Sequence, residues 1–257
     1  MPRMSDDKKP RPAAHDEPML TAARMLEWRR AATNAPLPRL PEAAILTHQR
    51  FLLPRRLPWR RDPVWRYFSF DARPLAGGAV TLAAVRGVGA PATAIAIEEL
   101  VAAGVHRLVA IDIAGSIDAG VRSGDAVLVE SALACDGTSR HYAGERVVRA
   151  SEALTRRLGG RLTADAIAFA AGGAWSTDAV YRETPAQLDQ ARRRGAVVAD
   201  METACVFAVA ASLGIEAAAV LVAADELRDA WHPPADMQLV RNRLRTLLEA
   251  ATACLLP

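Results

Sequence analysis

Short, nearly all-apolar segments alternate with longer helical segments along most of this chain, and this alternation restricts its fold more than any other feature. Strands exposed on one face show alternating polar residues, whereas strands buried on both faces read as continuous apolar runs. We expect buried strands at residues 43–47, 64–70, 79–86, 107–113, 125–130, 166–171, 196–199 and 216–224. The pattern predicts an α/β fold with a twisted, mostly parallel central sheet flanked by helices.

Helices are expected between these strands, and several carry recognisable start and stop residues. Pro91 lies in the first turn of one helix and Gly104 follows its last turn, while Gly195 and Gly214 end two others. The predicted helices span residues 18–33, 91–103, 151–158, 185–194, 201–213 and 235–255. Residues 1–17 are rich in proline and charge, and residues 34–41 contain three prolines. We therefore expect a partly disordered N-terminal tail and helix over residues 1–41 and a single domain over residues 42–257.

Composition and charge exclude several classes of protein. No apolar stretch approaches the roughly 20 residues of a membrane helix, and the N-terminus lacks the apolar core of a signal peptide. The three cysteines, Cys135, Cys205 and Cys254, show no CxxC spacing, so neither a disulfide framework nor a zinc site is expected. These features predict a soluble, cytoplasmic protein without a membrane partner, a metal or another cofactor.

The formal net charge of +3 combines a basic N-terminal part with an acidic remainder. Residues 1–70 contain 14 Lys and Arg against 7 Asp and Glu, and residues 71–257 contain 18 against 22. A basic segment of this kind suits either nucleic acid or an acidic neighbouring subunit. No helix-turn-helix, aromatic RNA-binding or zinc-finger pattern accompanies the charge, so nucleic acid is not expected as a partner.

Polar residues at strand ends are the candidates for function, because ligands of such sheets bind beyond the carboxyl ends of the strands. Gly87 and Gly89 open a helix directly after a strand, where backbone can approach a ligand closely or simply form a tight turn. Asp112 lies between Ile111 and Ile113 at the end of another strand. A buried carboxylate is costly unless it is paired or functional, although an Asp facing water at the strand edge is the alternative.

Two further strand ends carry carboxylates. Asp200 is well placed to cap the helix that follows it, but capping does not account for Glu202 at the mouth of an apolar, buried helix. A carboxylate in that place can accept two ribose hydroxyls. Asp225 follows the most apolar strand of the chain, where a partly dry pocket can keep a general acid protonated, although a capping role is equally consistent.

Six segments in this order resemble the nucleoside phosphorylase superfamily, which includes uridine phosphorylase, bacterial purine nucleoside phosphorylase and the methylthioadenosine nucleosidases. The resemblance covers roughly residues 79–230. The matching segments are GVGAPATAIAIEEL (87–100), AGSIDAGVRSGDAVLV (114–129), CDGTSRHY (135–142), WSTDAVYRE (175–183), VVADMETACVFAVAASLGI (197–215) and VLVAADEL (220–227).

The resemblance implies a nucleoside phosphorylase-like fold and an enzyme that cleaves the N-glycosidic bond of a nucleoside through a ribosyl cation-like state. It also implies a homo-oligomer, a dimer or larger, with active sites near subunit interfaces. By resemblance, Met201 and Glu202 bind the ribose and Asp225 protonates or hydrogen-bonds the leaving base. Gly89 lies in the glycine-rich loop of the family, and Trp175 falls where purine-cleaving members often place an aromatic ring against the base.

The acceptor side departs from the family pattern. Phosphorolytic members bind phosphate with a Gly-Asp-Pro-x-Arg loop and an Arg-x-Gly-Ser/Thr strand end. Residues 47–51 of this chain read THQRF, and the strand end presents Ala110, Asp112 and Ile113 in place of Arg, Gly and the hydroxyl residue. These changes remove phosphate ligands and add a negative charge.

Neither subgroup of the family is matched in full. Hydrolytic members place a water-activating Glu just after the first strand, where this chain has His48 and Gln49. The Gln-x-Arg with which uridine phosphorylases recognise pyrimidines is absent after Tyr181, where residues 182–184 read Arg-Glu-Thr. The identities of the base and the sugar therefore stay open.

Three functions are consistent with the sequence. The leading hypothesis is cleavage or exchange of an N-glycosidic bond with an acceptor site remodelled around Asp112, which would orient water in a hydrolase or another nucleophile in a transferase. The second is a phosphate-dependent phosphorylase that binds phosphate through Arg55, Arg56, Arg60 and Arg61. The third is a non-catalytic nucleoside-binding subunit.

Overall fold

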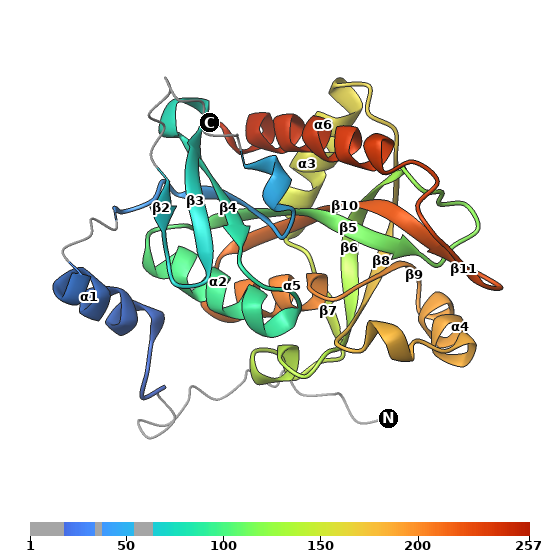
Figure 1. Cartoon of the computed structure of the whole chain (residues 1–257), viewed down its shortest axis with the longest axis horizontal. Coiled ribbons are helices and arrows are strands. Elements are labelled where there is room, and N and C mark those ends of the chain that lie inside the picture. The colour runs from blue at the N-terminus through green and yellow to red at the C-terminus, as the bar shows by residue number, and fades with distance from the viewer. Residues whose placement is uncertain (1–17, 34–37, 54–63) are drawn as a thin grey trace, which may run out of the picture.

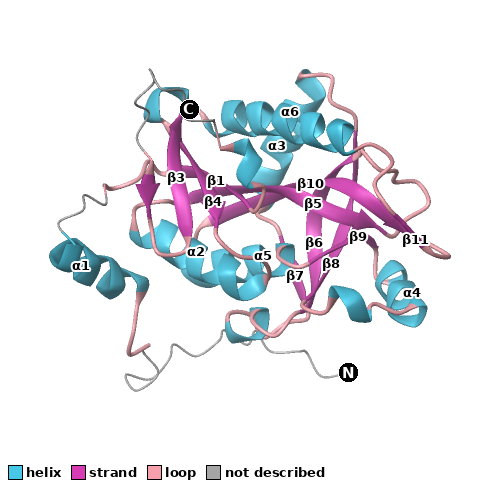
Figure 2. Ribbon diagram, in the orientation of Figure 1, coloured by secondary structure: helices cyan, strands magenta, loops and turns pink. Residues whose placement is uncertain are grey.

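A computed structural model describes residues 18–33, 38–53 and 64–257, in which helices cover both faces of a large central sheet (Figure 1, Figure 2). The helices are α1 (Ala22–Thr33), α2 (Ala90–Ala102), α3 (Glu152–Ala164), α4 (Pro185–Arg193), α5 (Thr203–Leu213) and α6 (Met237–Leu255). The strands are β1 (Ala43–Thr47), β2 (Trp65–Arg66), β3 (Phe70–Leu75), β4 (Val80–Val85), β5 (Arg107–Ser116), β6 (Ala126–Cys135), β7 (Val147–Arg149), β8 (Phe169–Thr177), β9 (Ala196–Asp200), β10 (Glu216–Leu227) and β11 (Trp231–His232). The α/β class is therefore confirmed.

The sheet is mixed, which corrects the expectation of a mostly parallel one. Its strand order is β11-β10-β6-β8-β9-β5-β1-β4-β3-β2, with β7 paired to β6 and β10 paired also to β5. Parallel pairing joins β1 to β4 and β5, β5 to β10, and β8 to β6 and β9. Antiparallel pairing joins β3 to β4, β5 to β9 and β6 to β10. An apolar run reports burial on both faces, and burial does not fix the direction of the neighbouring strand.

The core lies in two layers on opposite faces of the sheet. Alternate residues of β5 enter the two layers, with Leu108 and Ala110 on the side of α2 and α5 and Val109 and Ile111 on the side of α3 and α6. Helix α1 lies beside α2 at the edge of the molecule (Figure 1). Because β1 pairs in parallel with both β4 and β5, the carboxyl ends of these three strands meet at one edge of the sheet, where the candidate site lies.

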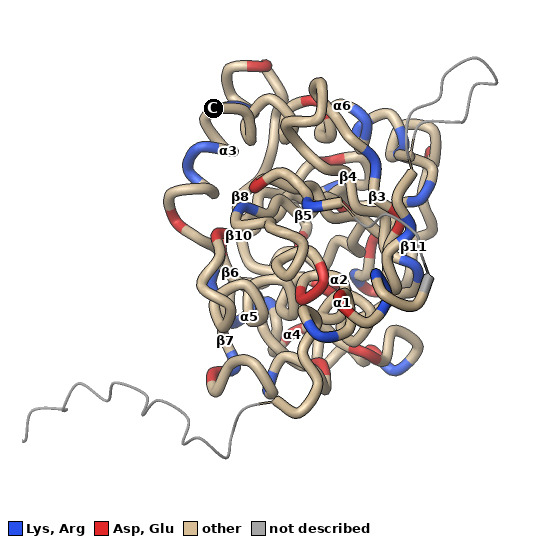
Figure 3. Tube along the Cα trace, turned by 90° about the vertical axis from the view of Figure 1, so that its left-hand side faces the viewer, with Lys and Arg blue, Asp and Glu red and all other residues tan. Residues whose placement is uncertain are grey.

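Some of the sequence-based expectations fall outside the described residues. These are the disorder of residues 1–17, part of the predicted linker, and the phosphate-binding role of Arg55, Arg56, Arg60 and Arg61. Across the described ranges, Arg, Asp and Glu are interspersed along the chain (Figure 3). The helices found in these ranges include none with the length and apolar character needed to cross a membrane.

Candidate active site

Asp112 is buried, with 7% of its surface exposed, and its carboxylate is held by the residues that follow β1. Oδ2 accepts hydrogen bonds from the backbone N (2.7 Å) and the Nδ1 (2.8 Å) of His48, and Oδ1 accepts one from Gln49 Nε2 (2.8 Å). The amide of Ile113 donates to Oδ1 at 3.0 Å. Strand β1 lies beside β5, so the chain leaving β1 meets the end of β5 directly. The carboxylate is thus paired inside the protein and does not face water at a strand edge.

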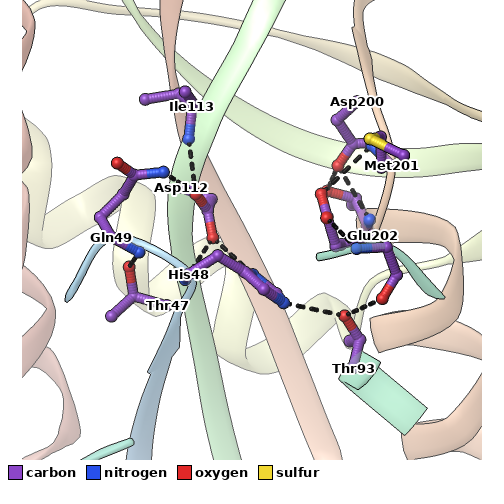
Figure 4. A network of polar contacts seen from close by, with 11 residues as sticks. Thr47, His48, Gln49, Thr93, Asp112, Ile113, Asp200, Met201 and Glu202 are labelled. Carbon is purple, nitrogen blue, oxygen red and sulfur yellow. Dashed lines mark hydrogen bonds and ion pairs between the residues drawn. The ribbon is translucent and has the colours of Figure 1, made fainter. Parts of the chain in front are cut away.

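His48 joins Asp112 to the start of α2. Its Nε2 lies 3.2 Å from Oγ1 of Thr93, a fully buried residue, and that hydroxyl donates to the carbonyl of Gly89 at 3.1 Å (Figure 4). Burial acts to lower the pKa of His48, but the hydrogen bond and charge of Asp112, together with the charges of Glu202 and Asp200, raise it above its usual value. The imidazole is therefore fixed at both nitrogens, with a carboxylate at one and a hydroxyl at the other.

Glu202 lies on the other side of Thr93, at the start of α5 (Figure 4). Its Oε1 accepts a hydrogen bond from the amide of Gly89 at 2.7 Å, and its Oε2 accepts one from the amide of Met201 at 3.2 Å. Gly89 has a φ of 85°, in the left-handed region that favours glycine, and this conformation turns its amide toward the carboxylate. Burial raises the pKa of Glu202 to about 7, with the charge of Asp200 adding to the rise and that of His48 opposing it.

Asp200 stabilises the backbone that carries Met201 and Glu202. It accepts hydrogen bonds from the amide of Thr203 at 2.8 Å, from the Thr203 hydroxyl and from the Ser176 hydroxyl. Burial raises its pKa, while these hydrogen bonds act in the opposite direction. The N-cap residue of α5 is Glu202, so the expectation that Asp200 occupies this position is wrong, although Asp200 binds the first amide of the helix from the end of β9.

Asp225 lies near the end of β10, at an irregularity in the pairing of β10 with β5. It pairs with Gly115, three residues beyond Asp112, and its Oδ1 lies 3.3 Å from the position that a Cβ on Gly115 would occupy. Its Oδ2 accepts a hydrogen bond from Trp231 Nε1 at 2.7 Å. The side chain is partly buried, and nothing in its hydrogen bonding identifies it as a helix cap.

Glu183 is not among the candidates predicted from the sequence. Residues 182–184 are notable there only because they lack the pyrimidine-recognition pattern. Its Oε2 is buried and has no hydrogen-bond partner among the described residues. Burial, followed by the charge of Asp225, raises the pKa of Glu183 to about 7. The signal available in the sequence was an acidic residue between polar neighbours after an apolar strand, which is too common to single out a site.

Trp175 is enclosed by other residues. Its side chain is 4% exposed and packs in a small cluster with residues of β6, β9 and α4. Leu227, two residues beyond Asp225, packs against the same cluster. The stacking of this indole on a base therefore stays a prediction.

Two described arginines near the end of β1 and β4 are already paired. Arg50 and Arg86 both bind the carboxylate of Asp71, at 2.8 Å and 3.0 Å. Within the described part of the chain, no group of three or more His, Cys, Asp or Glu side chains is arranged to hold a metal ion. The chemistry of this edge therefore rests on carboxylates, one histidine, hydroxyls and backbone amides.

Comparison with known proteins gives a consistent picture. The model of the family described as the phosphorylase superfamily matches residues 41–256. A guanosine phosphorylase of Halorubrum lacusprofundi is 31% identical over 178 residues, which cover 65% of this chain and 73% of the relative.

Solved structures match over most of the chain. A uridine phosphorylase from Vibrio fischeri superposes with a TM-score of 0.71 at 20% identity, over 84% of this chain and 92% of the other. An AMP nucleosidase from Bacteroides thetaiotaomicron superposes with a TM-score of 0.72 at 20% identity, over 91% and 96%. At this identity the two structures establish a shared fold.

Proposed function

The chain belongs to the phosphorylase superfamily, and we propose that it is an enzyme that cleaves the N-glycosidic bond of a nucleoside at an acceptor site remodelled around Asp112 and His48. In this proposal Glu202 and Met201 bind the ribose, with Gly89 close to it. Asp225 protonates the leaving base, and Trp175 lies against that base. The nucleosides and nucleotide in the names of the relatives and neighbours support a nucleoside-like substrate.

One observation carries the proposal: a single hydrogen-bonded network runs from Asp112 through His48 and Thr93 to Gly89 and Glu202. Each carboxylate oxygen has two acceptor sites, and the two backbone donors to Glu202 use only part of that capacity. The remaining lone pairs can accept ribose hydroxyls. A fixed negative charge at the ribose favours the positive charge that develops on the sugar as the glycosidic bond breaks.

The acceptor end of the network favours an uncharged nucleophile. A carboxylate about 4 Å from a unit anion, at an effective dielectric near 20, disfavours that anion by about 4 kcal/mol. Asp112 brings such a carboxylate to the strand end, and the nearby Arg50 and Arg86 are occupied by Asp71. The carboxylate of Asp112 disfavours phosphate, which is an anion, more than it disfavours uncharged water. We therefore assign the reaction as hydrolysis.

Release of free base is expected to be independent of phosphate. The test incubates the enzyme with guanosine, adenosine or uridine, with and without inorganic phosphate, and separates base, ribose and ribose 1-phosphate by chromatography. Free base and ribose at equal rates in both buffers support hydrolysis. A requirement for phosphate, with ribose 1-phosphate as product, would instead favour binding of phosphate by Arg55, Arg56, Arg60 and Arg61. Binding of the nucleosides without any cleavage would mark the chain as a non-catalytic subunit.

The proposal also includes a homo-oligomer. Large apolar side chains are exposed around the loop that carries Gly89, with Val88 at 67%, Phe68 at 60% and Ile95 at 43% exposure. Apolar surface gathered beside a site is typical of a protein interface. Light scattering at micromolar concentration is expected to give at least twice the chain mass of 27.5 kDa. A mass of one chain would contradict this part of the proposal.

A cytoplasmic location belongs to the same proposal. Cys135, Cys205 and Cys254 are free thiols, and thiols persist in reducing compartments.

A further inference from the structure

We propose that His48 is the general base that takes a proton from the attacking water, and that Asp112 is the positioning residue that orients it. This inference rests on the proposed function, which it extends by assigning the group that activates the acceptor.

The imidazole of His48 has a fixed orientation. The side chains of His48 and Asp112 are 9% and 11% exposed, and Oδ2 of Asp112 accepts from both the backbone N and the Nδ1 of His48. Gln49 donates to the other oxygen of the same carboxylate. Two donors from one residue to one oxygen set both the position of the backbone and the direction of the ring. Such orientation is what a histidine base requires of its carboxylate partner.

The contact with Asp112 also sets the tautomer of His48. A carboxylate only accepts hydrogen bonds, so Nδ1 carries the proton that faces Asp112. In the neutral ring the lone pair is then on Nε2, and Nε2 points toward Thr93, between the strand end and Glu202 (Figure 4). The basic nitrogen therefore faces the side of the network on which the proposed ribose site lies.

The protonated ring of His48 is also fully hydrogen-bonded. After proton transfer Nε2–H can donate to Thr93 Oγ1 at 3.2 Å, and that hydroxyl in turn donates to the carbonyl of Gly89. Nδ1–H keeps its bond to Asp112. The imidazolium formed during the reaction thus has a partner for each of its two protons, which stabilises the charge that develops on it.

The electrostatic surroundings act in the same direction. The charges of three carboxylates on three elements act on His48: Asp112 on β5, Asp200 on β9 and Glu202 at the start of α5. Together they outweigh the effect of burial and raise the pKa of His48. A raised pKa makes the imidazole a stronger base toward a proton of the attacking water.

The oxygen of water forms a bond to the anomeric carbon of the ribose while the bond from that carbon to the base nitrogen breaks. The electron pair of the broken bond leaves with the base, which takes a proton from Asp225, and one proton of the water passes to Nε2 of His48. The products are ribose and free base. Return of the proton from His48 to Asp225 through solvent restores the enzyme.

The test uses His48→Asn, because the asparagine amide can still donate to Asp112 while no basic nitrogen replaces Nε2. The substrates are guanosine and 4-nitrophenyl β-D-ribofuranoside, whose nitrophenolate leaves without a proton and so reports the acceptor half of the reaction alone. We expect kcat to fall by about 10²–10⁴-fold on both substrates, with KM changed only a few-fold. In the variant, the rise of kcat with pH is expected to lose the contribution of His48 and to keep only that of Glu202, whose pKa is about 7.

Two further variants and one control variant complete the test. His48→Gln gives a second side chain without a base, in case the asparagine variant does not fold. Asp112→Asn is expected to shift the rising limb of kcat to lower pH, because it removes a charge that raises the pKa of His48. His106→Gln is the matched control, since His106 is exposed next to the first residue of β5, and it is expected to retain the wild-type rate.

The outcomes are distinct. A wild type that cleaves these substrates, together with a folded His48→Asn that keeps its kcat and its pH dependence, would overturn the role of His48 and leave the proposed function intact. A wild type that cleaves neither these substrates nor adenosine and uridine would overturn both.

Discussion

Asp225→Asn is expected to lower the turnover of nucleosides by about 10²–10⁴-fold while leaving the release of nitrophenolate from 4-nitrophenyl β-D-ribofuranoside within a few-fold of the wild type. A general acid accelerates a reaction only where the leaving group needs its proton. A purine or pyrimidine base is a poor anion and needs it, whereas nitrophenolate does not. The measurement is the ratio of kcat on guanosine to kcat on the nitrophenyl riboside for both proteins.

The geometry supports this substitution as a selective test. Asp225 is partly buried near the end of β10, and its Oδ2 accepts from Trp231 Nε1. Asparagine can keep that hydrogen bond through its amide oxygen, so the change removes the acidic proton with little change in packing. Glu183 lies close enough for its pKa to respond to the charge of Asp225, and its Oε2 has no hydrogen-bond partner among the described residues, so we expect any residual proton to come from Glu183.

A matched control is available on the loop that follows. Asp229 has an 88% exposed side chain and contacts only His232 among the ion pairs of the described residues, so Asp229→Asn should leave both rates unchanged. Equal losses on the two substrates in Asp225→Asn would show that Asp225 supports the structure and does not donate a proton.

Local sequence patterns were sufficient for most helices of the fold. Residues 91–103 and 235–255 were predicted as helices, and the structure has α2 at Ala90–Ala102 and α6 at Met237–Leu255. Helix α3 was predicted to end at residue 158, but it continues through two glycines to Ala164. A Cβ on Gly159 would lie 3.1 Å from a methyl group of Leu128, so this glycine serves close packing of the helix on the sheet.

Strand directions could not be predicted in the same way. The residues of β10 and β6 read as buried strands, yet nothing in either run indicates that the two are antiparallel while β10 and β5 are parallel. Pairing direction depends on the connections that the chain makes in three dimensions, and a local pattern does not contain that information.

The residues of the candidate site also differ in whether a local sequence pattern predicts them. Asp112 could be found because a carboxylate between isoleucines is chemically conspicuous, and the structure pairs it as a buried carboxylate requires. In the sequence, the only indication for His48 is its position, where hydrolytic members of the family have a Glu. The sequence gives no indication for Thr93. Their importance depends on distances between β1, β5 and α2, which become known only when the chain is folded.

Glu202→Gln is expected to lower kcat/KM by roughly 10- to 150-fold, because charge-assisted hydrogen bonds of the kind proposed for the ribose contribute about 1.5–3 kcal/mol. The carboxylate must be ionised to favour the cation-like sugar. Since burial raises the pKa of Glu202 to about 7, wild-type kcat/KM should rise as pH increases toward neutrality. The glutamine variant mimics the protonated side chain, so the difference between the two proteins should shrink in acid.

The same substitution should stabilise the protein at neutral and alkaline pH. The pKa of Glu202 is raised from an ordinary value of 4.5 to about 7, so the protonated carboxyl is favoured in the folded state. Below about pH 4.5 the carboxyl of Glu202 is protonated in both the folded and the unfolded state, so the glutamine variant is no more stable than the wild type. As the pH rises to about 7, Glu202 ionises in the unfolded wild type before it does so in the folded protein. The free energy of unfolding of the glutamine variant then exceeds that of the wild type by on the order of 2–3 kcal/mol. Loss of one backbone hydrogen bond reduces this gain by about 1 kcal/mol.

Thermal unfolding of Glu202→Gln at pH 5 and pH 8 measures this gain, with Glu216→Gln, an exposed change at the start of β10, as the control. A melting temperature that increases at pH 8 while activity falls would identify a carboxylate kept in an unfavourable place for catalysis. A structural carboxylate would give the reverse, because its hydrogen bonds to Gly89 and Met201 would then contribute more than its burial costs. Loss of stability at pH 8 with activity retained would therefore remove Glu202 from the proposed ribose site.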